Sequence, residues 1–420
     1  MHSQSLTAKR IFLNACLVMF AGLVLLAPVS AARPNQDPSE RQRAFDLLQE
    51  SKYIEALPLF EKLATKNPND GQIIYWLGFL HVAKANDTKD SAERRAERVR
   101  GRKYLVRAKE LGVSDEFSES LLQSIPLDGG ADPTLSSNSA ADAAMKDAEA
   151  AFARGELDKA ILSYALAFQF DPKLYPAPLY AGDMEYRKGL NSTDPQTRSD
   201  QFDKAGIWYG KAIALDPDRE TAYRYWGDAL LKQGKADDAL AKYIEAIIAE
   251  PYNSLVYNGI KQWAEEKKVE LGHPRIEQPA PSIRSDNSGD NTTIIIDPGK
   301  LDPTSPAYYW SFYDLTRATY KTASFSKEYP DEKVYRHSLK EEAVALRTVA
   351  EIASKDFKAG KTKLLDVSLH NLIKLYEAGF LEAYVLYARP DAGIARDYAA
   401  YRATNRDKLR RYWLEVVIGG

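Results

Sequence analysis

A spaced pattern of four residues recurs along the chain and limits its fold more than any other feature. The pattern is a small residue, an aromatic residue four positions later, an apolar residue after three more, and a proline after five more. Its copies are Ala56, Phe60, Leu63 and Pro68; Ala160, Tyr164, Ala167 and Pro172; Ala205, Tyr209, Ala212 and Pro217; and Ala239, Tyr243, Ala246 and Pro251. Steps of four and three place the first three residues on one helical face, and a proline cannot continue the helix. Each copy therefore predicts one short helix with a buried face.

A second helix is predicted ahead of each copy, with a small residue that allows close approach: Ala44, Ala148, Gly182 or Gly227. A pair of short helices cannot bury its apolar faces alone, so such hairpins stack on one another. A fifth, degenerate copy lies between the first two. It has Leu77 and Gly78 in its first helix, Gly101, Leu105 and Ala108 in its second, and Val113 in place of the proline.

This pattern resembles the tetratricopeptide repeat (TPR) family, whose repeat of about 34 residues combines an aromatic residue, Leu-Gly, Ala, a second aromatic residue and Pro. The match is best from Tyr223 to Pro251 and extends over residues 38–270. The resemblance implies an all-α solenoid whose concave surface binds a protein or peptide partner. The first-helix residues that the resemblance places near this surface are Tyr180, Asp183, Tyr223, Tyr225 and Asp228.

The hairpins come in two lengths. The two small residues of a hairpin lie 12 positions apart in three hairpins and 23 apart in the other two. The additional 11 residues correspond to about three helical turns, so they can lengthen a helix without rotating its buried face away. We therefore expect helix from about Ser91 in one long hairpin and after Pro195 in the other. The order predicts a duplicated pair of hairpins, short then long, followed by one more.

Composition divides the chain further. The expected segments are a TPR-like pair at 38–113, a linker at 114–140 that separates two sub-arrays, an array with an end helix at 141–270, a linker at 271–305, and a small helical domain at 306–420. We expect one or two short strands in the second linker, around the β-branched run Thr292–Ile296. The helices expected in the last segment are 307–325, 339–357, 363 to about 388, and 392–417.

Residues 1–31 have the features of a secretory signal peptide. Lys9 and Arg10 precede an apolar run, and the small residues at 29–31 favour cleavage after Ala31. An uncleaved membrane anchor is the alternative, because the run is long enough to span a bilayer. Cleavage would remove Cys16, the single cysteine, and leave an exported protein, periplasmic or secreted from a bacterium, with no disulfide and no stable membrane span.

The charge of the chain argues against a nucleic-acid partner, and one locally basic segment could contact an anionic partner. Cleavage would leave 55 basic and 59 acidic residues, a net charge of −4, which predicts no nucleic-acid partner. Locally, residues 94–109 carry eight basic residues and one acidic residue. Arg95, Arg98, Arg102 and Lys109 are spaced to form a basic ridge on one helix. The ridge is either a solvated face or a contact for acidic proteins or for an anionic envelope component.

Two patterns in the last segment could bind a metal, each with a simpler interpretation. His337 and Glu341 lie four apart, but Ser338 followed by Glu341 is typical of a capping box at a helix start. On the helix expected from residue 363, two carboxylates and one imidazole lie on one face. Together with His337 or Glu342 they could bind a metal, although a solvated helix face is favoured. The three residues are Asp366, His370 and Glu377.

A third pattern in this segment is aromatic. Six rings beside Arg317 could form a ligand cage or, as we favour, part of a core. They are Tyr308, Tyr309, Trp310, Phe312, Tyr313 and Tyr320. No phosphate loop, dinucleotide fingerprint or nucleophile motif occurs, so we nominate no catalytic residue, metal or cofactor. The favoured function is an exported scaffold that binds a protein or peptide. The alternative is an enzyme or metal-binding protein with its site in residues 306–420 and the array as recruiting arm.

Overall fold

The computed structural model describes residues 38–130, 134–279, 302, 305–362 and 366–419. Within these ranges every regular element is helical and no strand occurs. The chain forms two compact units, Met1–Lys242 and Tyr243–Gly420, whose boundary falls within helix α12. The signal peptide and the strand expected at Thr292–Ile296 lie outside the described residues.

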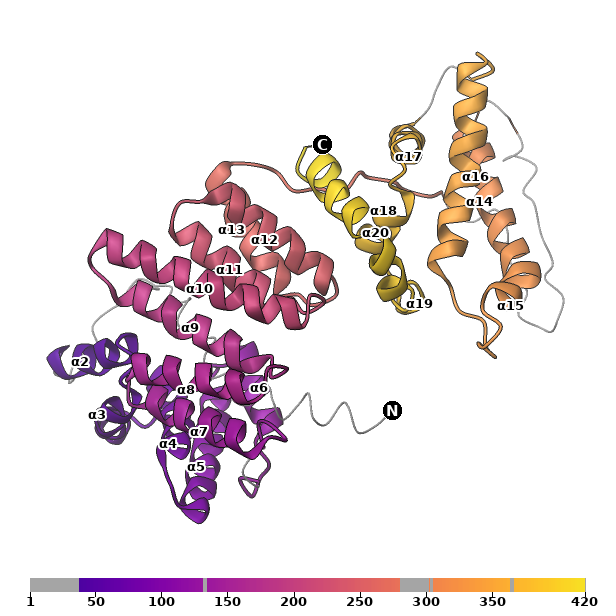
Figure 1. Ribbon diagram of the computed structural model, residues 1–420. Coiled ribbons are helices and arrows are strands. Elements are labelled where there is room, and N and C mark those ends of the chain that lie inside the picture. The colour runs from indigo at the N-terminus through magenta and orange to yellow at the C-terminus, as the bar shows by residue number, and fades with distance from the viewer. Residues whose placement is uncertain (1–37, 131–133, 280–301, 303–304, 363–365, 420) are drawn as a thin grey trace. The chain divides into compact units, whose positions relative to one another are not determined.

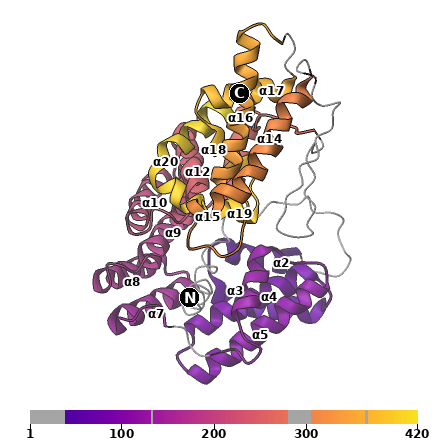
Figure 2. The same cartoon turned by 90° about the vertical axis from the view of Figure 1, so that its right-hand side faces the viewer.

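The first unit contains a series of helices that end with the beginning of α12 (Figure 1). They are α2 (Pro38–Gln49), α3 (Tyr53–Lys66), α4 (Gly71–Asp87), α5 (Ser91–Glu110), α6 (Glu116–Ser124), α7 (Ser139–Ala153), α8 (Leu157–Phe170), α9 (Pro176–Asn191), α10 (Pro195–Leu215), α11 (Thr221–Lys232) and α12 (Ala236–Ala249). Consecutive helices contact one another from α2 to α6 and again from α7 to α11, and Figure 2 shows α2 to α5 side by side.

The predicted buried face of each second helix is confirmed. The small residues Ala56, Ala160, Ala205 and Ala239 are fully buried, and so are the four aromatic residues that follow them. In the first long hairpin, Gly78 and Gly101 face each other so closely that a Cβ on Gly101 would lie 2.8 Å from the Gly78 carbonyl oxygen. The small residues therefore set the distance between paired helices, as the sequence pattern predicted.

The short hairpins share one turn geometry. Ser51, Gly155 and Gly234 have φ angles of 60°, 77° and 75°, and each precedes the small residue of its second helix by five positions. This left-handed conformation ends the first helix and suits glycine, which has no Cβ to clash. The repeated turn supports the interpretation of these segments as copies of one unit.

The long hairpins begin their second helices where the spacing predicted. Helix α5 starts at Ser91 and α10 starts at Pro195. Asp90 caps α5 by accepting a hydrogen bond from the Glu93 amide at 2.8 Å. Asp194 caps α10 by accepting one from the Thr197 amide at 2.7 Å. The two caps occupy equivalent positions in the duplicated pairs, so both inserted segments extend a helix.

The segment 114–140 differs from the expected open linker. It contains helix α6, and its Ile125 and Leu135 are buried in the core. That core is one cluster of apolar residues from Ala44 to Ala229, which includes residues on both sides of the segment. The segment is therefore not an open linker between two separate sub-arrays, because it contributes side chains to a shared core.

The second unit contains the remaining helices. They are the rest of α12, α13 (Val256–Lys267), α14 (Pro306–Thr319), the π-helical turn η3 (Tyr320–Ser324), α15 (Phe325–Glu328), α16 (Leu339–Lys358), α17 (Val367–Glu377), α18 (Leu381–Ala388), α19 (Ala392–Ala395), α20 (Tyr398–Tyr412) and the π-helical turn η4 (Trp413–Val417). The third predicted helix is broken at Gly379, whose φ of 74° ends α17. None of the helices described in either unit is both long and apolar enough to span a membrane.

Helix α20 packs on the end of α12, within the second unit. The Tyr398 hydroxyl of α20 donates to the Ile248 carbonyl at 2.7 Å, and Arg402 donates to the Ala249 carbonyl. These carbonyls belong to the last turn of α12, where no intrahelical donor remains. The expected boundary near residue 270 therefore does not separate two independent folding units, because α12 and α20 share hydrogen bonds.

Candidate partner-binding face and buried polar networks

Four of the five residues expected on the concave face are buried. Tyr180, Asp183, Tyr223 and Tyr225 are each less than 9% exposed, and only Asp228 of the five is partly exposed. The expectation that these side chains are open to a partner is therefore wrong for the first four. For Tyr180 and Asp183 the physical reason is that α9 packs against α8 and α10 and also bonds to the first hairpin, which the family resemblance did not foresee. Tyr223 and Tyr225 lie on α11, which packs against α10. The participation of these residues in binding stays an untested prediction.

The bond to the first hairpin comes from Arg187 on α9. Its guanidinium donates to the Tyr53 hydroxyl at 3.1 Å and to the Ser51 hydroxyl at 3.3 Å. It also lies over the Phe152 ring at 4.9 Å and 3.6 Å from the Asp183 carboxylate. One buried cation therefore joins segments more than 130 residues apart in the sequence.

Two buried carboxyl groups accompany this cation. Burial raises the pKa of Glu149 to about 8, although the Tyr164 hydroxyl, which donates to Oε1 at 2.7 Å, acts in the opposite direction. The other oxygen of Glu149 accepts no hydrogen bond within the described residues. Burial likewise raises the pKa of Asp183 to about 7, and Arg187 opposes this rise. Both groups thus retain protons at a pH where exposed carboxylates are ionised.

The predicted basic ridge has a different role from the expected one. Arg98 is buried, and it donates to the carbonyls of Gly129 and Gly130 at 2.7 and 3.1 Å. Arg102 donates to the carbonyls of Leu122 and Ile125, at the end of α6. Arg98 and Arg102 therefore bond to backbone carbonyls inside the chain, which is neither the solvated face nor the partner contact considered for the ridge.

The other two members of the ridge confirm this correction. Arg95 donates to the Asp128 carbonyl at 2.6 Å, and Lys109 pairs with Glu119 of α6 at 2.7 Å. Gly129 lies so close to α5 that a Cβ on it would be 2.4 Å from the Arg95 carbonyl oxygen. The ridge holds residues 122–130 against α5, which leaves the expected anionic envelope component without support.

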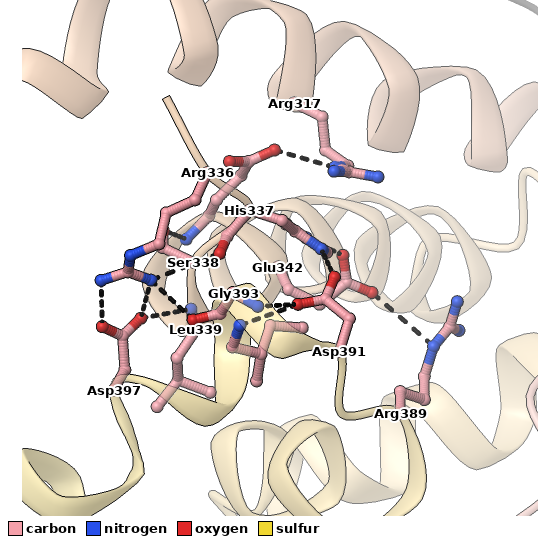
Figure 3. A network of polar contacts seen from close by, with 12 residues as sticks. Arg317, Arg336, His337, Ser338, Leu339, Glu342, Arg389, Asp391, Gly393 and Asp397 are labelled. Atoms are coloured by element: carbon pink, nitrogen blue, oxygen red, sulfur yellow. Dashed lines mark hydrogen bonds and ion pairs between the residues drawn. The ribbon is translucent and has the colours of Figure 1, made fainter. Parts of the chain in front are cut away.

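Figure 3 shows a second network, centred on His337 in the second unit. His337 Nδ1 lies 2.7 Å from Asp391 Oδ2, and Nε2 lies 3.1 Å from Glu342 Oε2. Burial lowers the pKa of His337, but the hydrogen bonds to Glu342 and Asp391 outweigh it and raise the pKa overall. The Tyr313 hydroxyl also donates to Glu342 Oε2 at 2.6 Å. His337 therefore has an acidic partner at each ring nitrogen.

The predicted helix cap at Ser338 is confirmed in part. The Ser338 hydroxyl accepts a hydrogen bond from the Glu341 amide at 3.2 Å, as in a capping box. The Glu341 carboxylate does not return this bond; it accepts from Arg317 at 2.9 Å and from the Tyr335 hydroxyl at 2.8 Å. A buried carboxylate is thus used to hold α14 against the start of α16.

The metal and ligand-cage hypotheses find no matching geometry. Asp366 caps α17, Glu377 pairs with Lys358 at 2.8 Å, and His370 is exposed. The described part of the chain contains no group of three or more His, Cys, Asp or Glu residues arranged to hold a metal ion. Four of the six clustered rings are buried in the core, which is the interpretation that the sequence favoured: Tyr309, Trp310, Tyr313 and Tyr320.

Comparison with known proteins assigns no family to this chain. No family model and no curated protein matches the chain. One solved structure that matches is a thermophilic TPR protein of Thermus thermophilus. The two sequences are 19% identical, the match covers 55% of this chain and 98% of that chain, and the TM-score is 0.24. At this identity and TM-score, the similarity establishes neither a family nor a function for this chain.

Proposed function

We propose that this chain is an exported TPR-type scaffold that binds a protein or peptide partner without covalent chemistry. The observation that supports the proposal most directly is the stack of helical hairpins with one core from Ala44 to Ala229. A stack of this kind offers an extended rigid surface, because each hairpin adds a helix pair to its neighbour. Such surfaces suit recognition better than small-molecule catalysis.

We place the partner contact on α11, the first helix of the last hairpin. Arg224, Asp228 and Leu231 are partly exposed and lie at steps of four and three, so they share one face of the helix. Arg224 is held by the Glu220 carboxylate at 2.9 Å. Asp228 lies close enough to Arg224 to act on the pKa of its guanidinium, which burial lowers and the charges of Glu220 and Asp228 raise overall. The face therefore offers charges of both signs beside an apolar side chain, which suits a polar partner segment that carries an apolar residue.

The proposal can be tested by capture from cells. Tagged chain is cross-linked in living cells, purified from the exported fraction, and analysed for co-purifying proteins and for its own N-terminus. We expect an N-terminus near Ala32 and one protein enriched over an untagged strain. Asp228→Lys should reduce the enrichment at least fivefold, because it reverses the charge on the α11 face.

The matched control is Asp237→Lys, which makes the same charge change at an exposed position at the start of α12. It should leave the enrichment unchanged. Equal enrichment with both variants would move the contact away from α11, and no enriched protein with the parent chain would contradict the scaffold function itself.

A further inference from the structure

Helix α8 exposes an apolar stripe on its outward face. Leu162, Leu166 and Phe170 are 69%, 42% and 43% exposed, and they follow one another at steps of four, along one side of the helix. No charged residue occurs from Ala160 to Phe170. Exposed apolar residues are ordinary when they are scattered, but a row of three large ones over two turns is typical of a contact surface.

The other hairpins of the same chain supply the comparison. The position six residues after the small residue of the second helix is Leu166 in α8. In the other four hairpins the equivalent residues are charged: Lys62, Arg107, Lys211 and Glu245. The Lys62 and Arg107 side chains are 59% and 47% exposed, so this position faces solvent in those hairpins. The stripe is therefore a particular property of α8 and not a requirement of the repeat.

We propose that α8 is the contact helix of a weak homodimer, in which the α8 helices of two copies pack antiparallel about a two-fold axis at Leu166. In such a contact each residue at the axis meets its own copy, so a charge there would face a like charge. Leucine at this position avoids the repulsion that Lys62, Arg107 or Lys211 would create. The spacing also places Leu162 of one copy opposite Phe170 of the other.

The size of the stripe sets the strength of the dimer. A stable interface buries about 800 Å² on each partner, and three partly exposed side chains provide only a fraction of that area. Ile207, which is 63% exposed, occupies the position of Leu162 in the next hairpin, so this position is apolar and exposed in α10 as well. We therefore expect a reversible dimer with a dissociation constant on the order of 10–100 µM.

Sedimentation velocity of the purified chain tests the proposal over a protein concentration from about 1 to 300 µM. The parent chain should shift from monomer to dimer as concentration rises. Leu166→Lys, which gives α8 the charge found in other hairpins, should weaken the dimer more than tenfold. Leu127→Lys is the matched control, because Leu127 is 82% exposed and lies outside α8, and it should dimerise as the parent chain does.

A cross-linking experiment tests the two-fold geometry separately. With Cys16 replaced by serine, Leu166→Cys should form a disulfide-linked dimer under mild oxidation, because the axis brings the two copies of residue 166 together. Leu162→Cys should not, since its opposite residue is 170. A chain that remains monomeric at the highest concentration contradicts the dimer, whether or not a different protein or a membrane binds the stripe. Equal dimerisation of the Leu166→Lys variant contradicts the placement on α8.

Discussion

Glu149 and Asp183 show how burial changes what a carboxyl group does. Both residues lie on first helices of the array, and the family resemblance placed Asp183 near the partner-binding surface. The structure encloses them, and burial raises the pKa of Glu149 to about 8 and that of Asp183 to about 7. Asp228, two hairpin helices further on, stays partly exposed and keeps the recognition role that we propose. Residue type alone does not distinguish these roles.

The stability of the chain should depend on the proton of Glu149. Because its pKa is raised on folding from about 4.5, the native state binds this proton more tightly than the unfolded state between about pH 4.5 and pH 8. The contribution to stability is therefore complete below pH 4.5 and is lost as the pH rises, by about 1.4 kcal/mol per pH unit. Glu149→Gln keeps the acceptor for Tyr164 and removes this dependence.

Urea unfolding of both proteins at pH 5, 6, 7 and 8 measures the difference. We expect the variant to lose less stability than the parent chain over this range and to be the more stable of the two at pH 8. Asp147→Asn, on the exposed side of α7, is the control and should follow the parent curve. Parallel curves for the parent chain and Glu149→Gln would contradict a protonated buried Glu149.

At the scale of helices, the sequence predicted what depends on a hairpin alone. Small and aromatic residues at steps of four and three face the partner helix of the same hairpin. Ala160 and Tyr164 are accordingly buried, as expected. The 11-residue insertions extended helices because three turns preserve the phase of the face. Contacts between segments that are distant in the sequence produce no regular spacing of residue types. The burial of α9 against the first hairpin could therefore not be predicted from the sequence. Helix α6 was missed for a related reason, because Gly, Pro and Ser flank a helix of only nine residues.

The arginines of α5 provide an element-scale prediction. Arg98→Met should lower the free energy of unfolding by about 2–3 kcal/mol, because the buried Gly129 carbonyl and the partly buried Gly130 carbonyl lose their charged donor. Arg100→Met, two residues away, removes an arginine whose side chain is 58% exposed and should cost less than about 1 kcal/mol. Urea unfolding measures both values. Equal losses would show that the Arg98 contacts do not hold residues 122–130 in place.

At the scale of the whole chain, the second unit includes the end of the array. Arg406 and Arg410 of α20 both donate to the Glu245 carboxylate of α12, at 2.9 and 2.7 Å. Together with Tyr398 and Arg402, which donate to the last carbonyls of α12, they cover the end that a repeat array must otherwise close with a polar helix. We predicted a separate helical domain from the sequence because the repeat pattern does not continue beyond α13.

The carboxylate of Glu245 should therefore control how firmly α20 is held. Glu245→Ala leaves two guanidinium groups without their shared partner, and the loss of partly buried, charge-assisted hydrogen bonds should cost about 1–2 kcal/mol locally. Hydrogen exchange of the α20 amides should then be roughly five- to thirtyfold faster, while exchange in α2 to α9 stays unchanged. Glu265→Ala, at an exposed position of α13, is the control and should leave α20 as it is in the parent chain. Unchanged exchange of α20 in Glu245→Ala would mean that the apolar contacts of this helix suffice, and that the C-terminal helices fold without help from the array.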